Sequence, residues 1–508
     1  TVVCRQEGAA AHMADAYGKL TGKPGVALVT RGPGSTNASI GVHTARQDST
    51  PLVLLVGQVS TKFLGREAWQ EIDIPRMFAP IAKWATQVDQ VERLPELLSR
   101  AFHVAVSGRP GPVVVALPED VLYAKTEVAD AARYQCVQAH PDAADLTRLR
   151  ELTLSAQRPF AILGGGGWNA AACANIEAFC TAFDLPVGTA FRRQDLFDNL
   201  HANYAGDVGV GINPKLAQRI RDADLLVAIG PRLGETTTSG YTLIDIPRPR
   251  QQLVHVHADD DELGRVYHAD LMIHSGPQEF AAAARTLTAP THCAWHTWTR
   301  STHADYLENL EHQPMPAAVD LGEVMTYLRE RLPADTIVTN GAGNYTGWVH
   351  RFYPYRGFRT QLAPASGVMG YGVPAACAAA LVHPERTVVC FAGDGCFLMN
   401  SQELATVKQY GLRVVFIVVN NGIYGSIRMH QEIHYPGRVH ATSLENPDFP
   451  ALARAYGLDG QRVERTDEFP AAFERALKAP AGALIELKTD AEAITPRTTL
   501  TALRQRAR

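Results

Sequence analysis

The sequence predicts an α/β protein made of three doubly wound parallel-sheet domains, and three observations support this fold class. The chain of 508 residues is too long for a single hydrophobic core. Short apolar runs such as PLVLLVG and VVFIVV alternate with helical patterns. This alternation recurs in three blocks separated by two irregular stretches. Buried parallel strands joined by crossover helices account for the pattern.

The first block spans residues 1–124. Its opening pattern, AAAHMADAYGKLTG, predicts a helix that ends at a glycine C-cap. GVALVT predicts a strand and RGPGSTN a glycine-rich turn, and further helix and strand patterns run to GPVVVALPEDV. Because the chain begins with Thr1 in what reads as the interior of a domain, we expect an N-terminal part of this block to be missing.

The second block spans residues 146–287 and the third spans residues 316–490. Residues 124–146 lack apolar periodicity and predict a linker, and a second loose segment is predicted at about 287–315. The second block contains RPFAILGGGG and ADLLVAIGPRLGE, and the third contains DTIVTN, TVVCFAGDGCF, RVVFIVVNN and GALIELKTD. Residues 491–508 are expected to form a C-terminal tail.

Composition excludes several classes of protein. The net charge is -4, with 46% hydrophobic and 20% charged residues, so nothing predicts a nucleic-acid partner. The longest apolar runs are strand-sized and fall far short of the roughly 20 residues that cross a bilayer. The eight cysteines form no CxxC pair, so we expect buried free thiols in a reducing, cytoplasmic compartment.

A carboxylate and an amide follow two successive strand patterns of the third block. Asp394 stands between Gly393 and Gly395 at the end of VVCFAG, and Asn421 comes 27 residues later, after VVFIVVN. We expect both side chains at one sheet edge, where helix N-termini bind ligands and glycines let a phosphate approach. Carboxylate, amide and backbone oxygens suit Mg²⁺. A GDG sequence alone is equally an ordinary turn, and the spacing to Asn421 favours the magnesium site.

The GDG sequence followed by NN about 26 residues later resembles the diphosphate-anchoring motif of thiamine diphosphate enzymes. The whole chain resembles the acetolactate synthase and pyruvate decarboxylase group of that family, because motifs in different blocks agree in order and spacing. The resemblance implies thiamine diphosphate and Mg²⁺ as cofactors. It implies Asp394, Asn421 and the backbone oxygen of Ile423 as metal ligands.

Other cofactor contacts follow from the same resemblance. NGAGNYTGW is similar to the segment that holds the diphosphate from the other side, although acetolactate synthases usually carry Gln-His in place of Asn344-Tyr345. Met369 stands where the family places an apolar residue that bends the cofactor, whereas composition alone would make it core filler. The implied cofactor-binding residues are Gly343, Asn344, Tyr345, Gly367, Met369, Gly393, Gly395, Cys396, Gly32 and Gly34. The last two, in RGPGSTN, are equally plain turn residues.

Three catalytic candidates also follow from the resemblance. Glu7 precedes the His12-Met13 pair by five residues, and a glutamate there hydrogen-bonds N1′ of the cofactor's aminopyrimidine in similar enzymes. Without that resemblance, a solvated glutamate in a first helical turn would be the ordinary interpretation. Gln70, in EAWQEID, resembles the FQE segment near the reacting carbon. His430 stands where acetolactate synthases carry a tryptophan that helps to choose the second 2-oxo acid.

The resemblance implies an acetolactate-synthase-like transferase or lyase that decarboxylates a 2-oxo acid and performs carboligation. A 2-oxo acid decarboxylase or C–C lyase of the same family is the first alternative, and a catalytically idle cofactor-binding subunit is the second. FAD, which the middle domain of true acetolactate synthases binds, is a candidate that GGGGWNAA does not favour, because it lacks the GxGxxG spacing. In similar enzymes Glu7 and Asp394 come from different subunits, which implies a homodimer or homotetramer with the active site at the interface.

Overall fold

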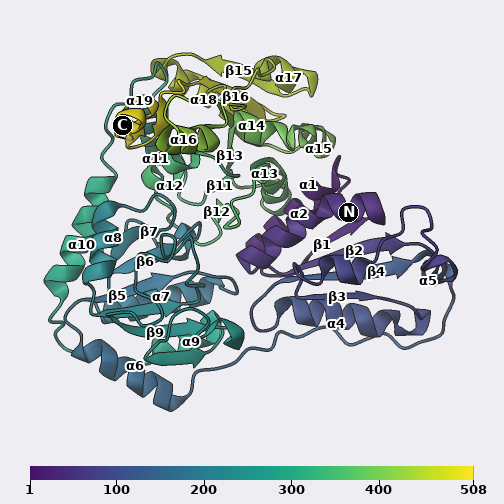
Figure 1. Ribbon diagram of the computed structural model, residues 1–508, viewed down its shortest axis with the longest axis horizontal. Helices are drawn as coiled ribbons and strands as arrows, with labels where there is room; N and C mark the ends of the chain where they lie inside the picture. Colours follow the sequence, from purple (N-terminus) through teal and green to yellow (C-terminus); the bar gives the residue numbers. More distant parts are fainter. Residues whose placement is uncertain (507–508) are drawn as a thin grey trace. The chain divides into compact units, whose positions relative to one another are not determined.

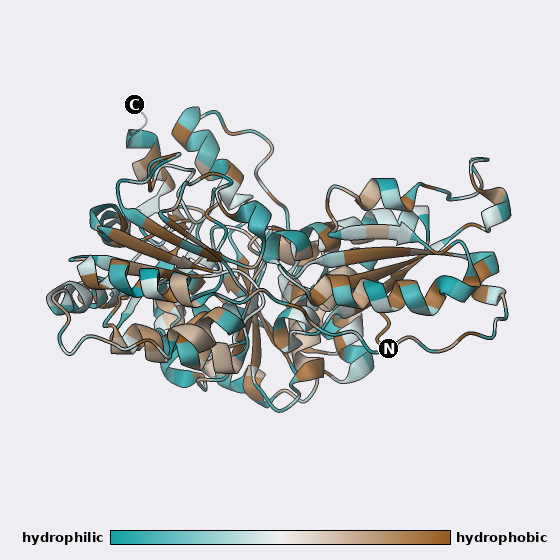
Figure 2. Ribbon diagram, turned by 90° about the horizontal axis from the view of Figure 1, so that it is seen from below, coloured by the Kyte–Doolittle hydropathy of each residue, from teal (hydrophilic) through white to brown (hydrophobic). Residues whose placement is uncertain are grey.

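The computed structural model describes residues 1–506 and confirms the predicted fold class, with three sheets of parallel strands and helices against them (Figure 1). The chain divides into two compact units, one of residues 17–309 with 355–359 and one of residues 1–16, 310–354 and 360 onward. Hydropathy colouring shows strands that are mainly hydrophobic and helices with hydrophilic stretches (Figure 2). No helix within residues 1–506 has the length and apolar character that crossing a membrane requires.

The first sheet has the strand order β1-β2-β4-β3. Its strands are β1 (Gly25–Val29), β2 (Leu52–Gln58), β3 (Trp84–Gln87) and β4 (Pro112–Pro118). The helices of this block are α1 (Glu7–Thr21), α2 (Gly32–Asp48), α3 (Ile74–Phe78), α4 (Leu94–Val106) and α5 (Glu119–Tyr123). β4 is buried along its whole length, as expected of a central parallel strand covered on both faces. α1 ends before Gly22, whose φ of 73° agrees with the predicted glycine C-cap.

The second sheet has six parallel strands in the order β10-β9-β8-β5-β6-β7. They are β5 (Pro159–Leu163), β6 (Val187–Ala190), β7 (Tyr204–Val208), β8 (Leu225–Ile229), β9 (Gln252–His257) and β10 (Leu271–His274). The helices are α6 (Ala143–Ser155), α7 (Ala170–Ala182), α8 (Pro214–Asp222), α9 (Pro277–Ala284) and α10 (His296–Asn309). α6 begins at a capping box between Asp142 and Asp145, which ends the irregular stretch before it.

The third sheet has the order β12-β11-β13-β14-β16-β15. Its strands are β11 (Ile337–Asn340), β12 (Gln361–Leu362), β13 (Val388–Gly393), β14 (Val415–Asn420), β15 (Asp459–Val463) and β16 (Ala483–Lys488). The helices are α11 (Leu321–Arg331), α12 (Thr346–Phe352), α13 (Gly372–Val382), α14 (Asp394–Leu398), α15 (Leu404–Tyr410), α16 (Gly425–His434), α17 (Phe449–Ala455) and α18 (Phe469–Lys478). A short antiparallel pair, β17 (Ala493–Thr495) and β18 (Thr498–Thr499), precedes α19 (Leu500–Arg506).

The register of the third sheet places the two singled-out strand ends side by side. β13 and β14 pair in parallel, with Gly393 opposite Val419. Asp394 begins α14 directly after β13, and Asn421 follows the last residue of β14. The expectation that both side chains leave adjacent parallel strands at the same edge is therefore confirmed.

Two segments differ from the sequence-based expectations. RGPGSTN is not a turn, because residues 32–37 form the first turns of α2, with a proline near the helix start. The segment at 287–315 contains α10, whose buried positions are Thr299, Thr302 and Tyr306 rather than aliphatic residues, so no apolar period marks it. Within the predicted C-terminal tail, residues 491–506 contain β17, β18 and α19.

Candidate cofactor site

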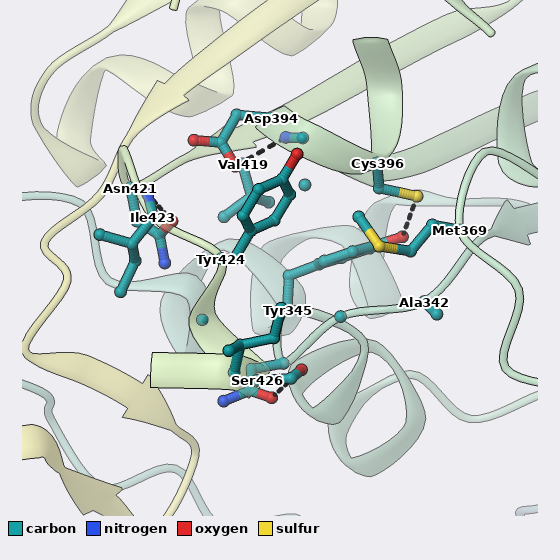
Figure 3. A pocket seen from close by; sticks show the side chains of 16 residues that line it. Ala342, Tyr345, Met369, Asp394, Cys396, Val419, Asn421, Ile423, Tyr424 and Ser426 are labelled. Atoms are coloured by element: carbon teal, nitrogen blue, oxygen red, sulfur yellow. Dashed lines mark hydrogen bonds between the residues drawn. The ribbon is translucent and has the colours of Figure 1, made fainter. Parts of the chain in front are cut away.

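A hollow opens at the carboxyl ends of β13 and β14, with a volume of about 510 Å³ that includes its open mouth. Asp394, Asn421 and Ile423 lie on one side of it, and Met369 and Cys396 lie on the other (Figure 3). The sequence-predicted residues that line it are Gly343, Asn344, Tyr345, Met369, Gly393, Asp394, Gly395, Cys396, Asn421 and Ile423. The fold thus brings together ten residues that are spread over about 80 positions of the chain.

The carboxylate of Asp394 is 3% exposed and held by three donors. Its Oδ1 accepts from the Gly395 N–H at 2.9 Å. Its Oδ2 accepts from the Gly422 N–H at 2.9 Å and from Asn446 Nδ2 at 2.8 Å. Burial raises the pKa of Asp394 above its ordinary value, and the hydrogen bonds, first that of Gly395, act in the opposite direction. A buried carboxylate of this kind is well suited to a cation.

The loop after β14 contributes Asn421 and Ile423 to the lining of the same hollow. Asn421 Oδ1 accepts from the Ile423 N–H at 3.2 Å, which fixes the amide over its own loop. Gly422 has a φ of 67°, a backbone conformation that glycine adopts without strain. A buried carboxylate and an amide oxygen in one hollow are hard-oxygen donors of the kind that Mg²⁺ takes, so Asp394 and Asn421 fit that ion.

Tyr345 lies across the floor of the hollow. A Cβ added at either Gly343 or Gly393 would lie 3.0 Å from its ring, so the ring packs where both glycines lack a side chain. The Tyr345 hydroxyl accepts from the Gly341 N–H at 3.1 Å and lies 3.6 Å from Cys396 Sγ. The ring therefore points toward Cys396 and Met369 (Figure 3).

The first turn of α16 forms another wall, which the sequence did not single out. Ser426 Oγ donates to Asn344 Oδ1 at 2.6 Å. Asn344 Nδ2 donates in turn to the backbone oxygen of Ile494 at 3.0 Å. Tyr424 also lines the hollow, and a Cβ at Gly395 would lie 2.6 Å from its ring. The C-terminal segment is therefore attached to the wall of the hollow through one asparagine.

A second link between α16 and the C-terminal segment lies further along that helix. Glu432 is 1% exposed and accepts from Arg504 Nε at 2.9 Å and from the same guanidinium at 2.8 Å. Arg428 and the Gly437 N–H also donate to this carboxylate. These contacts, that of Arg504 first, lower the pKa of Glu432 to about 2. No motif signals this pair, because its members lie 72 residues apart.

Three predicted residues of the same compact unit do not line the hollow. Glu7 is the first residue of α1. Gly367 has a φ of 69°, with no other heavy atom within 4 Å of where a Cβ would be. His430 is exposed on α16, and its ring stacks on that of His434 with centroids 6.1 Å apart.

Gly32, Gly34 and Gln70 belong to the other compact unit. The Gly32 N–H donates to the Gln70 backbone oxygen at 2.9 Å, and a Cβ at Gly32 would lie 2.8 Å from that oxygen. A Cβ at Gly34 would lie 2.9 Å from Thr30 Cγ2. Both glycines are therefore required by the chain's own packing, in addition to any contact with a ligand.

The glycines of GGGGWNAA likewise serve the backbone. A Cβ at Gly165 would lie 2.0 Å from the Gly230 oxygen, and one at Gly166 would lie 2.1 Å from the Ser49 oxygen. Gly164 is equally close-packed, since its Cβ would meet Ala190 at 2.7 Å. Local packing accounts for these three glycines without a nucleotide.

Comparisons with known proteins match all three blocks. The chain is similar to the N-terminal TPP binding domain of thiamine pyrophosphate enzymes over residues 1–77, to their central domain over 146–284 and to their C-terminal TPP binding domain over 341–487. It is 34% identical to the acetolactate synthase large subunit of Parasynechococcus marenigrum, covering 96% of this chain and 80% of that protein. It is 30% identical to the acetolactate synthase isozyme 2 large subunit of Escherichia coli, covering 96% of this chain and 88% of that protein.

Proposed function

The chain belongs to the thiamine pyrophosphate enzyme family, with acetolactate synthase large subunits among its relatives, and from that membership we propose its activity. We propose a thiamine diphosphate- and Mg²⁺-dependent enzyme that decarboxylates a 2-oxo acid and joins the remaining unit to a second carbonyl compound. The observation that carries the proposal is the hollow at the adjacent carboxyl ends of β13 and β14, which Asp394 and Asn421 line together.

The chain's own residues have distinct tasks in this proposal. Thiamine diphosphate, when bound, supplies a nucleophilic carbon and an electron sink. Asp394, Asn421 and the Ile423 carbonyl would hold Mg²⁺, which neutralises the diphosphate. Gly393 and Gly395 line the same hollow at the start of α14, and their missing side chains leave room for the rings of Tyr345 and Tyr424. Met369 lines the opposite side of the hollow with an apolar side chain, which would exclude water from a bound cofactor.

Glu7 is proposed as the acid that hydrogen-bonds the aminopyrimidine, acting in a homodimer or homotetramer. Glu7 does not line the hollow of its own chain, which supports its supply by a second copy. The first sheet also exposes apolar side chains on its edge strand, with Val26 51% and Leu28 73% exposed, and Ile40 on α2 is 43% exposed. Exposed apolar groups of this kind favour burial against another subunit.

The domain limits and the location also remain proposals. We propose a pyrimidine-binding domain at residues 1–124, a middle domain at 146–287, a diphosphate domain at 316–490 and a C-terminal segment at 491–508. A cytoplasmic location is supported by the free state of all eight cysteines. FAD stays a candidate for the middle domain. The test is the absorbance of the purified protein at roughly 350–450 nm, where a bound flavin absorbs.

The alternative activity is simple decarboxylation or C–C cleavage without carboligation. His430 favours this alternative, because it replaces the tryptophan by which similar enzymes choose a second 2-oxo acid. In this chain His430 is exposed and stacks on His434 rather than lining the hollow. The catalytically idle subunit is the remaining alternative, and the presence of Glu7, Asp394 and Asn421 together weighs against it.

The purified protein should be incubated with pyruvate, thiamine diphosphate and Mg²⁺, and acetolactate, acetaldehyde and CO₂ should be quantified. Acetolactate that depends on both cofactors would support the proposal. Acetaldehyde without acetolactate would reject carboligation in favour of the decarboxylase. A panel of other 2-oxo acids extends the assay, and no turnover with any of them would favour the lyase or the idle subunit. Asp394→Ala serves as the metal-site control and should lose all cofactor-dependent turnover.

A further inference from the structure

We propose that Asn446 is a positioning residue that fixes which oxygen of Asp394 faces the metal ion. This inference rests on the proposed function, because it concerns the Mg²⁺ site of that function. Asn446 lies in the loop before α17, 52 residues from Asp394, and belongs to none of the motifs that predict the site.

The amide of Asn446 bridges the ends of the two site strands. Its Nδ2 donates to Asp394 Oδ2 at 2.8 Å and to Asn420 Oδ1 at 3.0 Å. The Gly422 N–H donates to the same two oxygens, at 2.9 Å and 3.2 Å. Two separate donors therefore hold the end of β13 to the end of β14, on the side of the carboxylate away from Gly395.

This arrangement distinguishes the two oxygens of Asp394. Oδ2 accepts from both Asn446 and Gly422, so both of its lone pairs are used. Within residues 1–506, Oδ1 accepts a hydrogen bond from the Gly395 N–H and so keeps one lone pair. Oδ1 is therefore the oxygen that Asp394 presents to a cation.

The orientation of the Asn446 bridge is itself fixed from behind. Asn420 Nδ2 donates to Glu486 Oε1 at 2.6 Å, and Arg462 Nε donates to Glu486 Oε2 at 2.8 Å. Glu486 is 1% exposed, and its two carboxylate oxygens accept these two hydrogen bonds. Asn420 must therefore turn its amide nitrogen toward Glu486 and its oxygen toward Asn446. That oxygen takes one Asn446 proton and leaves the other for Asp394.

Other side chains at position 446 would not make the same bridge. Alanine would leave Asp394 Oδ2 with the Gly422 N–H as its donor and would remove the side-chain link to Asn420 Oδ1, so the carboxylate would be held less firmly. Serine has a single proton to donate and could satisfy one of the two oxygens. An aspartate would place a second carboxylate beside Asp394 and repel it.

Isothermal titration with Mg²⁺ and Ca²⁺, in the presence of thiamine diphosphate, tests the proposal. Mg²⁺ requires near-octahedral geometry at about 2.0–2.1 Å, whereas Ca²⁺ accepts flexible coordination, so a misplaced ligand costs Mg²⁺ more. Asn446→Ala is expected to raise the Mg²⁺ dissociation constant roughly 10- to 100-fold and the Ca²⁺ constant by a clearly smaller factor. Asn446→Ser should give an intermediate value and decides the case if the alanine variant does not fold.

Glu445→Gln is the matched control, since Glu445 is the exposed neighbour of Asn446, and its Mg²⁺ affinity should equal that of the unmodified chain. An Asn446→Ala affinity within about threefold of the unmodified chain would overturn the proposal, and so would equal losses for both ions, which mean a loosened loop. Asp394→Ala should bind neither ion. If the unmodified chain binds no metal with thiamine diphosphate, the proposed function itself fails. If the unmodified chain binds metal and the Asn446 variants bind it with the same affinity, this inference alone fails.

Discussion

Replacing Arg504 with Ala should loosen the α16 wall of the hollow from the far end of that helix. Arg504 lies on α19 and grips Glu432 with two hydrogen bonds, at 2.9 Å and 2.8 Å. α16 begins at the hollow, where its first residues Gly425, Ser426 and Ile427 form part of the lining. A change at one end of α16 is therefore transmitted to the hollow by a single helix of 10 residues.

The magnitude follows from what Glu432 keeps and loses. A hydrogen bond to a charged group contributes about 1.5–3 kcal/mol, and Arg504 makes two, but its side chain is 33% exposed, which reduces their value. Glu432 keeps Arg428 and the Gly437 N–H, so it is not stripped to the unpaired buried charge that costs about 3–5 kcal/mol. We expect Arg504→Ala to lower the free energy of local opening by about 2 kcal/mol. Arg504→Lys should lower it by about half of that, because lysine keeps the charge but cannot make two parallel hydrogen bonds.

Hydrogen exchange followed by mass spectrometry gives the most direct measurement. A loss of about 2 kcal/mol corresponds to roughly 30-fold faster exchange of the amides whose opening requires the Arg504–Glu432 contact to break. The faster exchange should cover α16 as well as α19, and thiamine diphosphate affinity should fall with it. Arg506→Ala, on the exposed end of the same helix, is the matched control and should leave α16 unchanged. Faster exchange confined to α19 would refute the coupling between the C-terminal helix and the hollow.

Three further predictions concern the site and its surroundings. Gly395→Ala places a Cβ 2.6 Å from the Tyr424 ring, so it should cost about 1–3 kcal/mol of stability or of thiamine diphosphate binding. Urea unfolding measures the first and titration the second. Gly57→Ala is the control and should cost far less, because the nearest atom to its Cβ lies at 3.8 Å. Because the pKa of Glu432 is lowered to about 2, its contribution to stability is complete above the ordinary pKa of 4.5 and is lost as the pH falls from 4.5 toward 2. The urea midpoint of Glu432→Gln should therefore change less over that pH range than the midpoint of the unmodified chain. Parallel pH dependences of the two midpoints would contradict this. Glu7→Gln should lower turnover about 10²- to 10⁴-fold while thiamine diphosphate still binds, and unchanged turnover would exclude its proposed role.

The main features of the third sheet were predictable because they depend on local signals. β13 and β14 are short and apolar, and a single polar residue, Asp394 or Asn421, follows each, so their parallel pairing and shared edge follow from chain order. Asp394 and Asn421 mark those ends directly in the sequence. The three-domain fold was predictable for the same reason, since each block repeats strand and helix patterns of ordinary length.

Segments whose burial depends on polar residues were not predictable. α10 is anchored by Thr299, which donates to the Asp184 backbone oxygen at 2.6 Å, and by Trp295 directly before the helix, which donates to the Phe183 backbone oxygen at 3.0 Å. These anchors give no apolar period, so the segment reads as loose. RGPGSTN reads as a turn because glycine and proline usually mark one, yet proline is also favoured in the first turn of a helix, where it lies here.

Asn446 shows why residues that hold the ligand-binding groups of a site in place escape sequence analysis. It stands before Pro447 and Asp448, and Asp448 is the N-cap of α17, so the local pattern is fully explained as a helix start. Its partners Asp394 and Asn420 lie 52 and 26 residues away, and only the pairing of β13 with β14 brings them within reach. A motif reports the residues that ligands touch, whereas the residues that hold those groups in place follow from the sheet's register.

The same reasoning changes where the specificity of this chain should be sought. The sequence directs attention to His430, but that side chain is exposed and stacks on His434 in the chain described. Ser426 and Ile427, about one turn earlier on α16, line the hollow, and Ser426 is hydrogen-bonded to Asn344. Because the C-terminal segment holds that asparagine through the Ile494 oxygen, the position of the wall is set jointly by α16 and by the last residues of the chain. Exchanging Ile427 for a larger or smaller side chain should therefore alter the product ratio more than exchanging His430 does.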